Sequence, residues 1–354
     1  MKQSLLFAGI MLNVLAATAA APVPTSSSAI GLATTAAGSP PTIGNAMPAA
    51  VELGATRVPV ATATASSTTA RASATPAAAV APRAAPLVIT DDTGKTVTLP
   101  AIPTRIVSLA PGATEMLFAA GAGKHVIATV EYSDEPPAAK QVPRIGDVVA
   151  IDMERLVALR PEVAVVWPGG GNPAQIEEIS RMHIPLYRQQ VNTLADIAGS
   201  LRRLGALAGT RDAAEQAAQK IETRLATLAR TYGSSRHPSV LMEVWNHPFY
   251  TVGGTHLMSD ALRICGARNV FGDLKELGPV IDVEAVVARD PDIIVAAAPP
   301  GAGAEWLADW KRFTTLRAVR TGNLIAFEDQ RLTRLGPSVV DATEALCNAL
   351  AKAH

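Results

Sequence analysis

The stretch IDMERLVALRPEVAVV occupies residues 151–166, and a second version of it, IDVEAVVARDPDIIVA, occupies residues 281–296. Seven of the sixteen aligned positions carry the same residue, among them the glutamates Glu154 and Glu284. Each copy has the spacing of a short amphipathic helix, then a proline-containing turn, then an apolar run typical of a buried strand. The chain is therefore predicted to contain two related α/β units that present equivalent glutamates.

A second, weaker similarity supports this duplication. Residues 114–122, TEMLFAAGA, align with residues 259–267, SDALRICGA. Both segments are typical of a helix that is capped at its first residue, Thr114 or Ser259, and ends at a glycine before an apolar strand. A repeat that occurs only twice is not a solenoid, so we expect two lobes with a ligand cleft between them.

Strands alternate with helices throughout the folded part, which indicates mainly parallel sheets. Between the lobes, residues 211–232 carry apolar side chains at a 4-3-4-3-4 spacing. This spacing predicts one helix of roughly 33 Å with a single buried stripe. The predicted fold class is α/β, with two similar lobes of mainly parallel sheets joined by one long helix that holds them nearly fixed.

Composition sets the predicted boundaries. Residues 1–20 combine a basic start, an apolar run too short to span a bilayer and an A-x-A site, which predicts a cleaved signal peptide rather than a membrane anchor. Residues 21–86 are rich in Ala, Pro, Ser and Thr and lack aromatics, which predicts a disordered tether, either a spacer or an insertion without a role. An N-terminal lobe (87–206), a connecting helix (207–233) and a C-terminal lobe (234–354) follow.

Charge and cysteine content narrow the function. Lys+Arg and Asp+Glu balance at 31 each without a basic stripe, which disfavours nucleic acid as a partner. The two cysteines, Cys265 and Cys347, both lie in the second lobe, and two cysteines of an exported protein usually pair. Two buried free thiols are the alternative.

Motifs for catalysis or metal binding are not found in the sequence. No two of the six histidines stand three or four residues apart, and C-x-x-C does not occur, so no metal site is expected. The glycines at 169–171 are not followed by the Lys-Ser/Thr of a phosphate-binding loop, and there is no G-x-S-x-G elbow. The chain is predicted not to be an enzyme.

Several motifs, in order, resemble the periplasmic cobalamin-binding proteins, which are the substrate-binding partners of ABC importers. The similar runs are RIVSLAPGATEMLFAAGAG (105–123), YSDEPP (132–137), IDMERLVALRPEVAVVWPGG (151–170), RICGARNVF (263–271) and ALCNAL (345–350). The resemblance implies a monomeric periplasmic carrier that holds cobalamin or a related corrinoid edge-on between its lobes. It also implies delivery to a dimeric ABC permease at the inner membrane.

The resemblance assigns Glu154 and Glu284 to positions that dock into arginine pockets of the permease. One carboxylate per lobe suits a two-fold permease, and charge complementarity serves register and association rate more than affinity. The alternative is that both are exposed helix carboxylates satisfied by water or, for Glu154, by a neighbouring arginine.

The resemblance also assigns residues to the ligand. They are Tyr132, Trp167, Phe249 and Arg334. Flat aromatic faces suit a macrocycle because dispersion scales with contact area. Two other aromatic positions of the family are occupied here by Val148 and Gly278, and the loop 329–337 departs from the family pattern. These departures leave open a haem or iron-siderophore carrier of the same fold, or a tethered protein-binding or sensor module.

Overall fold

The computed structural model describes residues 85–233 and 237–353. The predicted signal peptide lies outside these ranges, as does the predicted tether apart from its last two residues. Across the described ranges, no helix combines the length and the hydrophobicity needed to cross a lipid bilayer.

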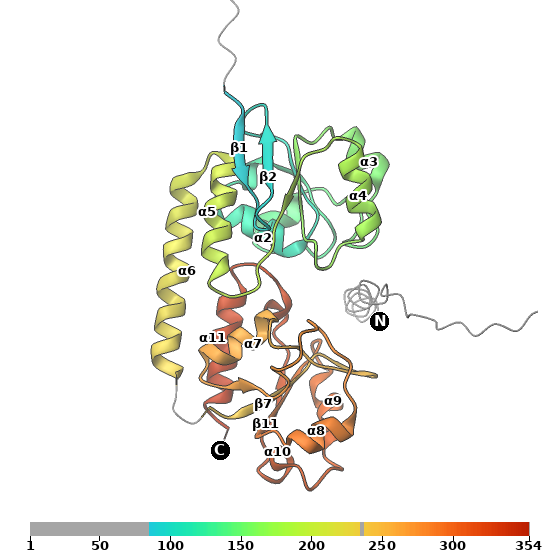
Figure 1. The fold of residues 1–354 in the computed structure, drawn as a ribbon, viewed down its shortest axis with the longest axis vertical. Coiled ribbons are helices and arrows are strands. Elements are labelled where there is room, and N and C mark those ends of the chain that lie inside the picture. Colours follow the sequence, from blue (N-terminus) through green and yellow to red (C-terminus); the bar gives the residue numbers. More distant parts are fainter. Residues whose placement is uncertain (1–84, 234–236, 354) are drawn as a thin grey trace, which may run out of the picture. The chain divides into compact units, whose positions relative to one another are not determined.

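Within the described residues, the first lobe contains a parallel sheet with the strand order β4-β3-β5-β6 (Figure 1). In that order the strands span Val126–Ala128, Ile106–Ser108, Val163–Val166 and Leu186–Arg188. The lobe's helices are α2 (Pro111–Ala119), α3 (Met153–Ala158), α4 (Pro173–Arg181) and α5 (Asp196–Ala208). An antiparallel hairpin precedes them, formed by β1 (Leu87–Thr90) and β2 (Thr96–Leu99). Short 3-10 helices, η1 and η2, span Gly123–His125 and Pro137–Gln141.

The second lobe repeats this strand order as β10-β7-β11-β12, again with parallel pairing. In that order the strands span Arg268–Asn269, Ser239–Glu243, Ile293–Ala297 and Leu324–Phe327. The helices are α7 (Leu257–Ile264), α8 (Val283–Arg289), α9 (Gly303–Trp310), α10 (Arg317–Arg320) and α11 (Val339–Leu350). A small hairpin pairs β8 (Trp245–Asn246) with β9 (Phe249–Tyr250), and η3 spans Gln330–Thr333. The repeated sequence supplies α3–β5 and α8–β11, and both strands hold the third place in their sheets, which confirms the predicted duplication.

The two copies of the repeat begin in the same way. The carboxylates of Asp152 and Asp282 cap their helices by accepting the N–H of Arg155 and Ala285, respectively. Such a cap satisfies one of the backbone donors that a helix leaves unpaired at its N-terminus. Helix capping therefore explains why both copies of the repeat have an aspartate at this position.

The predicted caps at Thr114 and Ser259 are wrong. α2 already begins at Pro111, whose fixed φ suits the first helical position, and α7 begins at Leu257. Both hydroxyl residues are thus buried inside their helices. The hydroxyl of Thr114 lies 2.6 Å from that of Thr129. It therefore forms a hydrogen bond with another buried hydroxyl and does not accept a backbone N–H at the start of the helix.

α6 spans Arg211–Tyr232 as one continuous helix, as its spacing predicts. Its buried positions are Ala214, Ala218, Ile221, Leu225 and Leu228. They belong to a hydrophobic core that also includes Val163 of the first sheet and Val240 of the second. Figure 1 shows the helix running alongside both lobes. Because a close-packed core shared by both sheets resists deformation, we expect the lobes to keep a nearly fixed separation.

Cys265 and Cys347 form a disulfide bond, which confirms the predicted pairing. Cys265 is the residue after α7, and Cys347 lies in α11. The bond therefore fastens the C-terminal helix to the rest of the second lobe. In the chain-entropy account, closing a loop with a sequence separation of 82 stabilises a fold by about 4 kcal/mol.

Candidate functional site

A cavity of about 290 Å³ is lined by residues of both lobes. Most of its wall comes from segments that follow a strand: β3, β5 and β6 in the first lobe, and β7, β11 and β12 in the second. The lining residues of these segments are residues 110–113, 167, 169, 189, 244, 299, 300, 330 and 332–335. Ligands of α/β proteins bind outside the carboxyl ends of the strands, so this is where the predicted cleft was expected.

Three of the four residues assigned to the ligand meet in this cavity. Tyr132 and Trp167 line it from the first lobe, and Arg334 lines it from the second. Tyr132 follows β4 and holds a left-handed backbone conformation, with φ at 64°. Such a backbone is uncommon for a tyrosine and fixes the direction in which its side chain leaves the loop.

Trp167 directly follows β5 and lies against the glycines after it. A Cβ atom built on Gly170 would fall 1.8 Å from the indole ring, so a side chain at this position would force the ring out of its place. The ring is only partly buried. The glycine run therefore allows a large flat side chain to lie against the backbone with part of its surface free.

The structure does not bring Phe249 into the cavity wall. Phe249 lies in β9, and its ring packs 4.9 Å from that of Trp310 and 5.7 Å from that of His247, measured between centroids. Its aromatic surface thus covers α9 within the second lobe. Because residues of a short hairpin alternate between two faces, sequence position alone did not determine which face Phe249 would occupy.

Val148 and Gly278, the two positions at which the resembling family has aromatic residues, line the cavity. The rest of the apolar lining was not singled out from the sequence. The other apolar side chains of the wall belong to Ala110, Pro111, Ala113, Val244, Met258, Leu277, Pro299, Pro300, Leu332 and Leu335. The site is therefore mainly aliphatic, with Trp167 and Tyr132 as its large aromatic surfaces.

Few charged groups face this apolar wall. Asp134 is neutralised by Arg144, whose guanidinium lies 3.2 Å away. Arg334 forms no ion pair within 4.0 Å among the residues that the structure describes, so its guanidinium can bind a ligand, although its charge also acts to lower the pKa values of Glu115 and Asp329. Gln189 is buried, and its side-chain amide donates across the lobes to the carbonyl of Leu335 at 3.3 Å.

His256 also lines the cavity, and burial lowers its pKa to about 4. The neutral imidazole accepts the backbone N–H of Met258 at Nδ1, 3.1 Å away. The proton of a neutral imidazole must then sit on Nε2, which leaves no free lone pair for a metal ion. Within the described ranges, no group of three or more His, Cys, Asp or Glu side chains could hold a metal.

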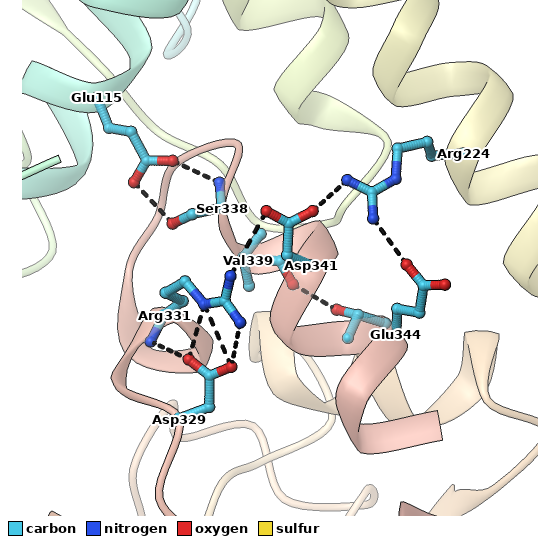
Figure 2. Close-up of polar contacts among 9 residues, drawn as sticks. Glu115, Arg224, Asp329, Arg331, Ser338, Val339, Asp341 and Glu344 are labelled. Carbon is cyan, nitrogen blue, oxygen red and sulfur yellow. Dashed lines mark hydrogen bonds and ion pairs between the residues drawn. The ribbon is translucent and has the colours of Figure 1, made fainter. Parts of the chain in front are cut away.

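The segment of the second lobe between β12 and α11 forms one wall of the cavity; an internal ion pair braces its start, and its end is tied to the first lobe (Figure 2). At its start, Arg331 binds the carboxylate of Asp329, with the closest pair of atoms 2.6 Å apart. At its end, Glu115 of α2 accepts the N–H and the hydroxyl of Ser338. Burial raises the pKa of Glu115 above its ordinary value, although the two donors of Ser338 oppose this.

The long helix reaches the same region. Arg224 of α6 pairs with Asp341 and, at 2.7 Å, with Glu344, both on the first turns of α11 (Figure 2). Asp341 also lies 3.6 Å from Arg331. The wall segment is thus held directly by α2 and α11, and α6 in turn holds α11, which limits the freedom of the segment to move.

Glu154 and Glu284 are exposed, each as the second residue of its helix. The structure therefore leaves both side chains free to meet a partner, at equivalent places in the two lobes. Their predicted role in docking stays a prediction.

The sequence pattern of the periplasmic binding protein family matches residues 106–330. The chain belongs to the periplasmic binding protein family. As a member, this periplasmic binding protein is a non-enzymatic transport component. It is 31% identical over 252 residues to the vitamin B12-binding protein of Photorhabdus laumondii subsp. laumondii. The aligned residues cover 71% of this chain and 89% of that protein.

Solved structures show the same fold. The periplasmic vitamin B12 binding protein of Vibrio cholerae is 29% identical, with a TM-score of 0.64 over 71% of this periplasmic binding protein and 98% of that chain. A periplasmic haem binding protein from Pseudomonas aeruginosa is 26% identical, with a TM-score of 0.61 over 71% and 94% of the two chains. Relatives with different named ligands therefore share this two-lobed architecture.

Proposed function

We propose that this periplasmic binding protein captures cobalamin or a related corrinoid between its lobes and delivers it to an ABC importer permease. The observation that carries the proposal is the cavity at the carboxyl ends of both sheets, where Trp167 and Tyr132 face the wall around Arg334. The similarity to vitamin B12-binding proteins over about 70% of the chain supports it.

The size and chemistry of the cavity suit a large planar guest held by its edge. About 290 Å³ is at the small end of ligand cavities, so a macrocycle would extend beyond it. A corrinoid carries neutral amides around its rim and a broad apolar face. Dispersion against Trp167 and the aliphatic wall would supply most of the affinity, with few polar contacts required.

A haem carrier is the second candidate, favoured by the unpaired charge of Arg334. Haem carries two carboxylates, and a cationic side chain in an apolar wall would pair with one of them. Val148 and Gly278, in place of aromatics, leave the cavity wall less specialised for a corrin ring. The solved haem-binding relative shows that the fold is compatible with such a ligand.

Titration of the purified full-length chain with cyanocobalamin, cobinamide and haemin, followed by calorimetry and absorbance, separates the two candidates. We expect saturable, sub-micromolar binding of a corrinoid at one equivalent, and weaker binding of haemin. Arg334→Gln should weaken haemin more than cobinamide, since only haemin offers a carboxylate. A Soret band with haemin and no heat with either corrinoid would replace the first candidate by the second.

Location in the periplasm belongs to the same proposal, supported by the predicted signal peptide at residues 1–20 and by relatives named periplasmic. Cell fractionation and N-terminal sequencing of the mature protein test it. Recovery of the intact N-terminus from the cytoplasm would contradict it. We also propose that the carrier is a monomer, which light scattering of the purified protein checks.

Docking through Glu154 and Glu284 completes the proposed cycle. Loaded protein added to spheroplasts should drive uptake, and Glu154→Gln with Glu284→Gln should reduce it without weakening corrinoid binding in solution. The defect should shrink at high salt, because screening weakens the contribution of exposed charges in the wild type as well. Unchanged uptake by the double variant at low salt would contradict this role.

A further inference from the structure

The two copies of the repeat agree on their exposed face and differ in their core. Apart from the capping aspartates, the positions exposed in both copies carry Glu, Val and Ala in each lobe. They are Glu154, Val157 and Ala158 on α3, and Glu284, Val287 and Ala288 on α8. Together these six residues are called the duplicated face.

The positions buried in both copies are far less alike. Leu156 corresponds to Val286, and Ala164 to Ile294, and of the five shared buried positions only Val165 and Val295 match. Packing normally constrains buried side chains and leaves exposed ones free to change. Here the order is reversed, so the folding of each lobe does not explain why the exposed residues are the same.

The identical residues form one surface on each helix. Positions i, i+3 and i+4 of a helix lie next to one another, so each glutamate stands beside a valine and an alanine. Val157 is 48% exposed and Val287 is 42% exposed, which is high for large aliphatic side chains. Figure 1 shows α3 and α8 on the side of their lobes away from α6. Both surfaces are therefore clear of the helix that joins the lobes.

We propose that the duplicated face is an apolar contact surface for the permease, in which Val157 and Val287 supply affinity and the glutamates supply register. The inference rests on the proposed delivery function and adds a stated chemistry to the partner. That partner would be a two-fold membrane protein whose two equivalent sites each combine a cation with a shallow aliphatic hollow. A charged hollow alone would require the glutamates but not the identical valines and alanines.

Uptake by spheroplasts supplied with purified protein loaded with radiolabelled cyanocobalamin tests this contact. We expect Val157→Ser and Val287→Ser each to raise the protein concentration for half-maximal uptake about fivefold, because burying half of a valine contributes on the order of a tenfold change or less. The two effects should multiply in the double variant. Val157→Ile and Val287→Ile should restore uptake, and the serine defects should persist at high salt, unlike those of the glutamate variants.

The matched control is Val88→Ser, since Val88 is 60% exposed on β1 outside the repeat. It should leave uptake unchanged. The serine variants of α3 and α8 should keep the wild-type melting curve and corrinoid affinity, because Val and Ser have similar helix propensities and both valines are exposed. Wild-type uptake by the double serine variant would overturn the inference while leaving the proposed function intact. Absence of corrinoid binding or uptake with the wild type would overturn both. Self-association through this face, abolished by the same variants, would assign it to a second copy and also overturn the inference.

Discussion

The carboxylate of Glu115 on α2 of the first lobe accepts both the backbone N–H and the hydroxyl of Ser338, which stands immediately before α11 in the second lobe. These residues are 223 positions apart in the sequence. The contact acts as a helix cap supplied by the other lobe, and it closes the wall segment that carries Arg334. It therefore ties this wall of the cavity to the first lobe.

Removing this cap should destabilise the protein and loosen the cavity. Glu115→Ala leaves two partly buried donors of Ser338 without their acceptor, so we expect a loss of about 1–3 kcal/mol in the free energy of unfolding. Ligand affinity should fall as well, since the wall segment loses its anchor. Urea denaturation and calorimetric titration measure the two effects. Glu115→Gln, which retains one acceptor, is the control, and equal stability of all three proteins would contradict the coupling.

Glu243 should make the stability of the protein depend on pH. It is buried at the end of β7, where the indole N–H of Trp310 donates to it at 2.8 Å, and burial raises its pKa from 4.5 to about 8. The folded protein therefore holds this proton more tightly than the unfolded chain. The stabilisation is complete below about pH 4.5 and is lost as pH rises towards about 8.

The variant Glu243→Gln removes this titration but keeps an acceptor for Trp310. We expect the wild type to lose stability relative to the variant by at most about 1.4 kcal/mol per pH unit between these limits. Urea denaturation at a series of pH values measures the difference. Parallel stability curves for the two proteins would show that Glu243 titrates normally.

Asp92 anchors the N-terminal hairpin to the first lobe. Its buried carboxylate accepts hydrogen bonds from the hydroxyls of Tyr187 and Ser200, both at 2.6 Å, and from Arg203 at 2.7 Å. Asp92→Ala should lower the free energy of unfolding by about 1–3 kcal/mol, because the hydroxyls of Tyr187 and Ser200 lose their acceptor while Arg203 stays partly exposed to water. Thermal unfolding measures this loss. Glu177→Ala, at an exposed position of α4, should have little effect, and similar losses in both variants would count against a special role for Asp92.

Trp167 and Phe249 should behave differently although the resemblance gave both to the ligand. Trp167→Ala should weaken corrinoid binding at least tenfold, since a large aromatic contact is lost, while Trp167→Phe keeps part of it. Phe249→Ala should lower stability, because its ring packs on Trp310, but should leave affinity nearly unchanged. Calorimetric titration of the three variants separates these outcomes. A larger loss of affinity in Phe249→Ala than in Trp167→Ala would reverse the assignment.

Local periodicity predicted much of the fold. The apolar spacing of residues 211–232 predicted the bounds of α6, and the repeated segment predicted two related α/β lobes; the strand order that the two sheets share was not predicted. The first residues of helices were predicted less accurately. After a strand, a helix can begin at a proline, and a threonine a few residues later can be either the cap of a helix or a buried residue inside it. The sequence therefore predicts a cap at Thr114, whereas the helix begins at Pro111.

The site was predictable only in part. Trp167 could be placed at the cavity because it follows a buried strand and precedes glycines. Phe249 could not, since the direction of its side chain depends on the pairing of a two-residue hairpin. The contact of Glu115 with Ser338 has no local signal, because it depends on how the two lobes pack against each other.

Fluorescence titration of the full-length protein with cyanocobalamin tests most directly whether one corrinoid is gripped between the lobes against Trp167. We expect saturable quenching of tryptophan fluorescence at one equivalent of ligand, with sub-micromolar affinity. Most of the quenching should be lost in Trp167→Phe, even though three other tryptophans remain. No saturable quenching in the wild type, or equal quenching in Trp167→Phe, would contradict it.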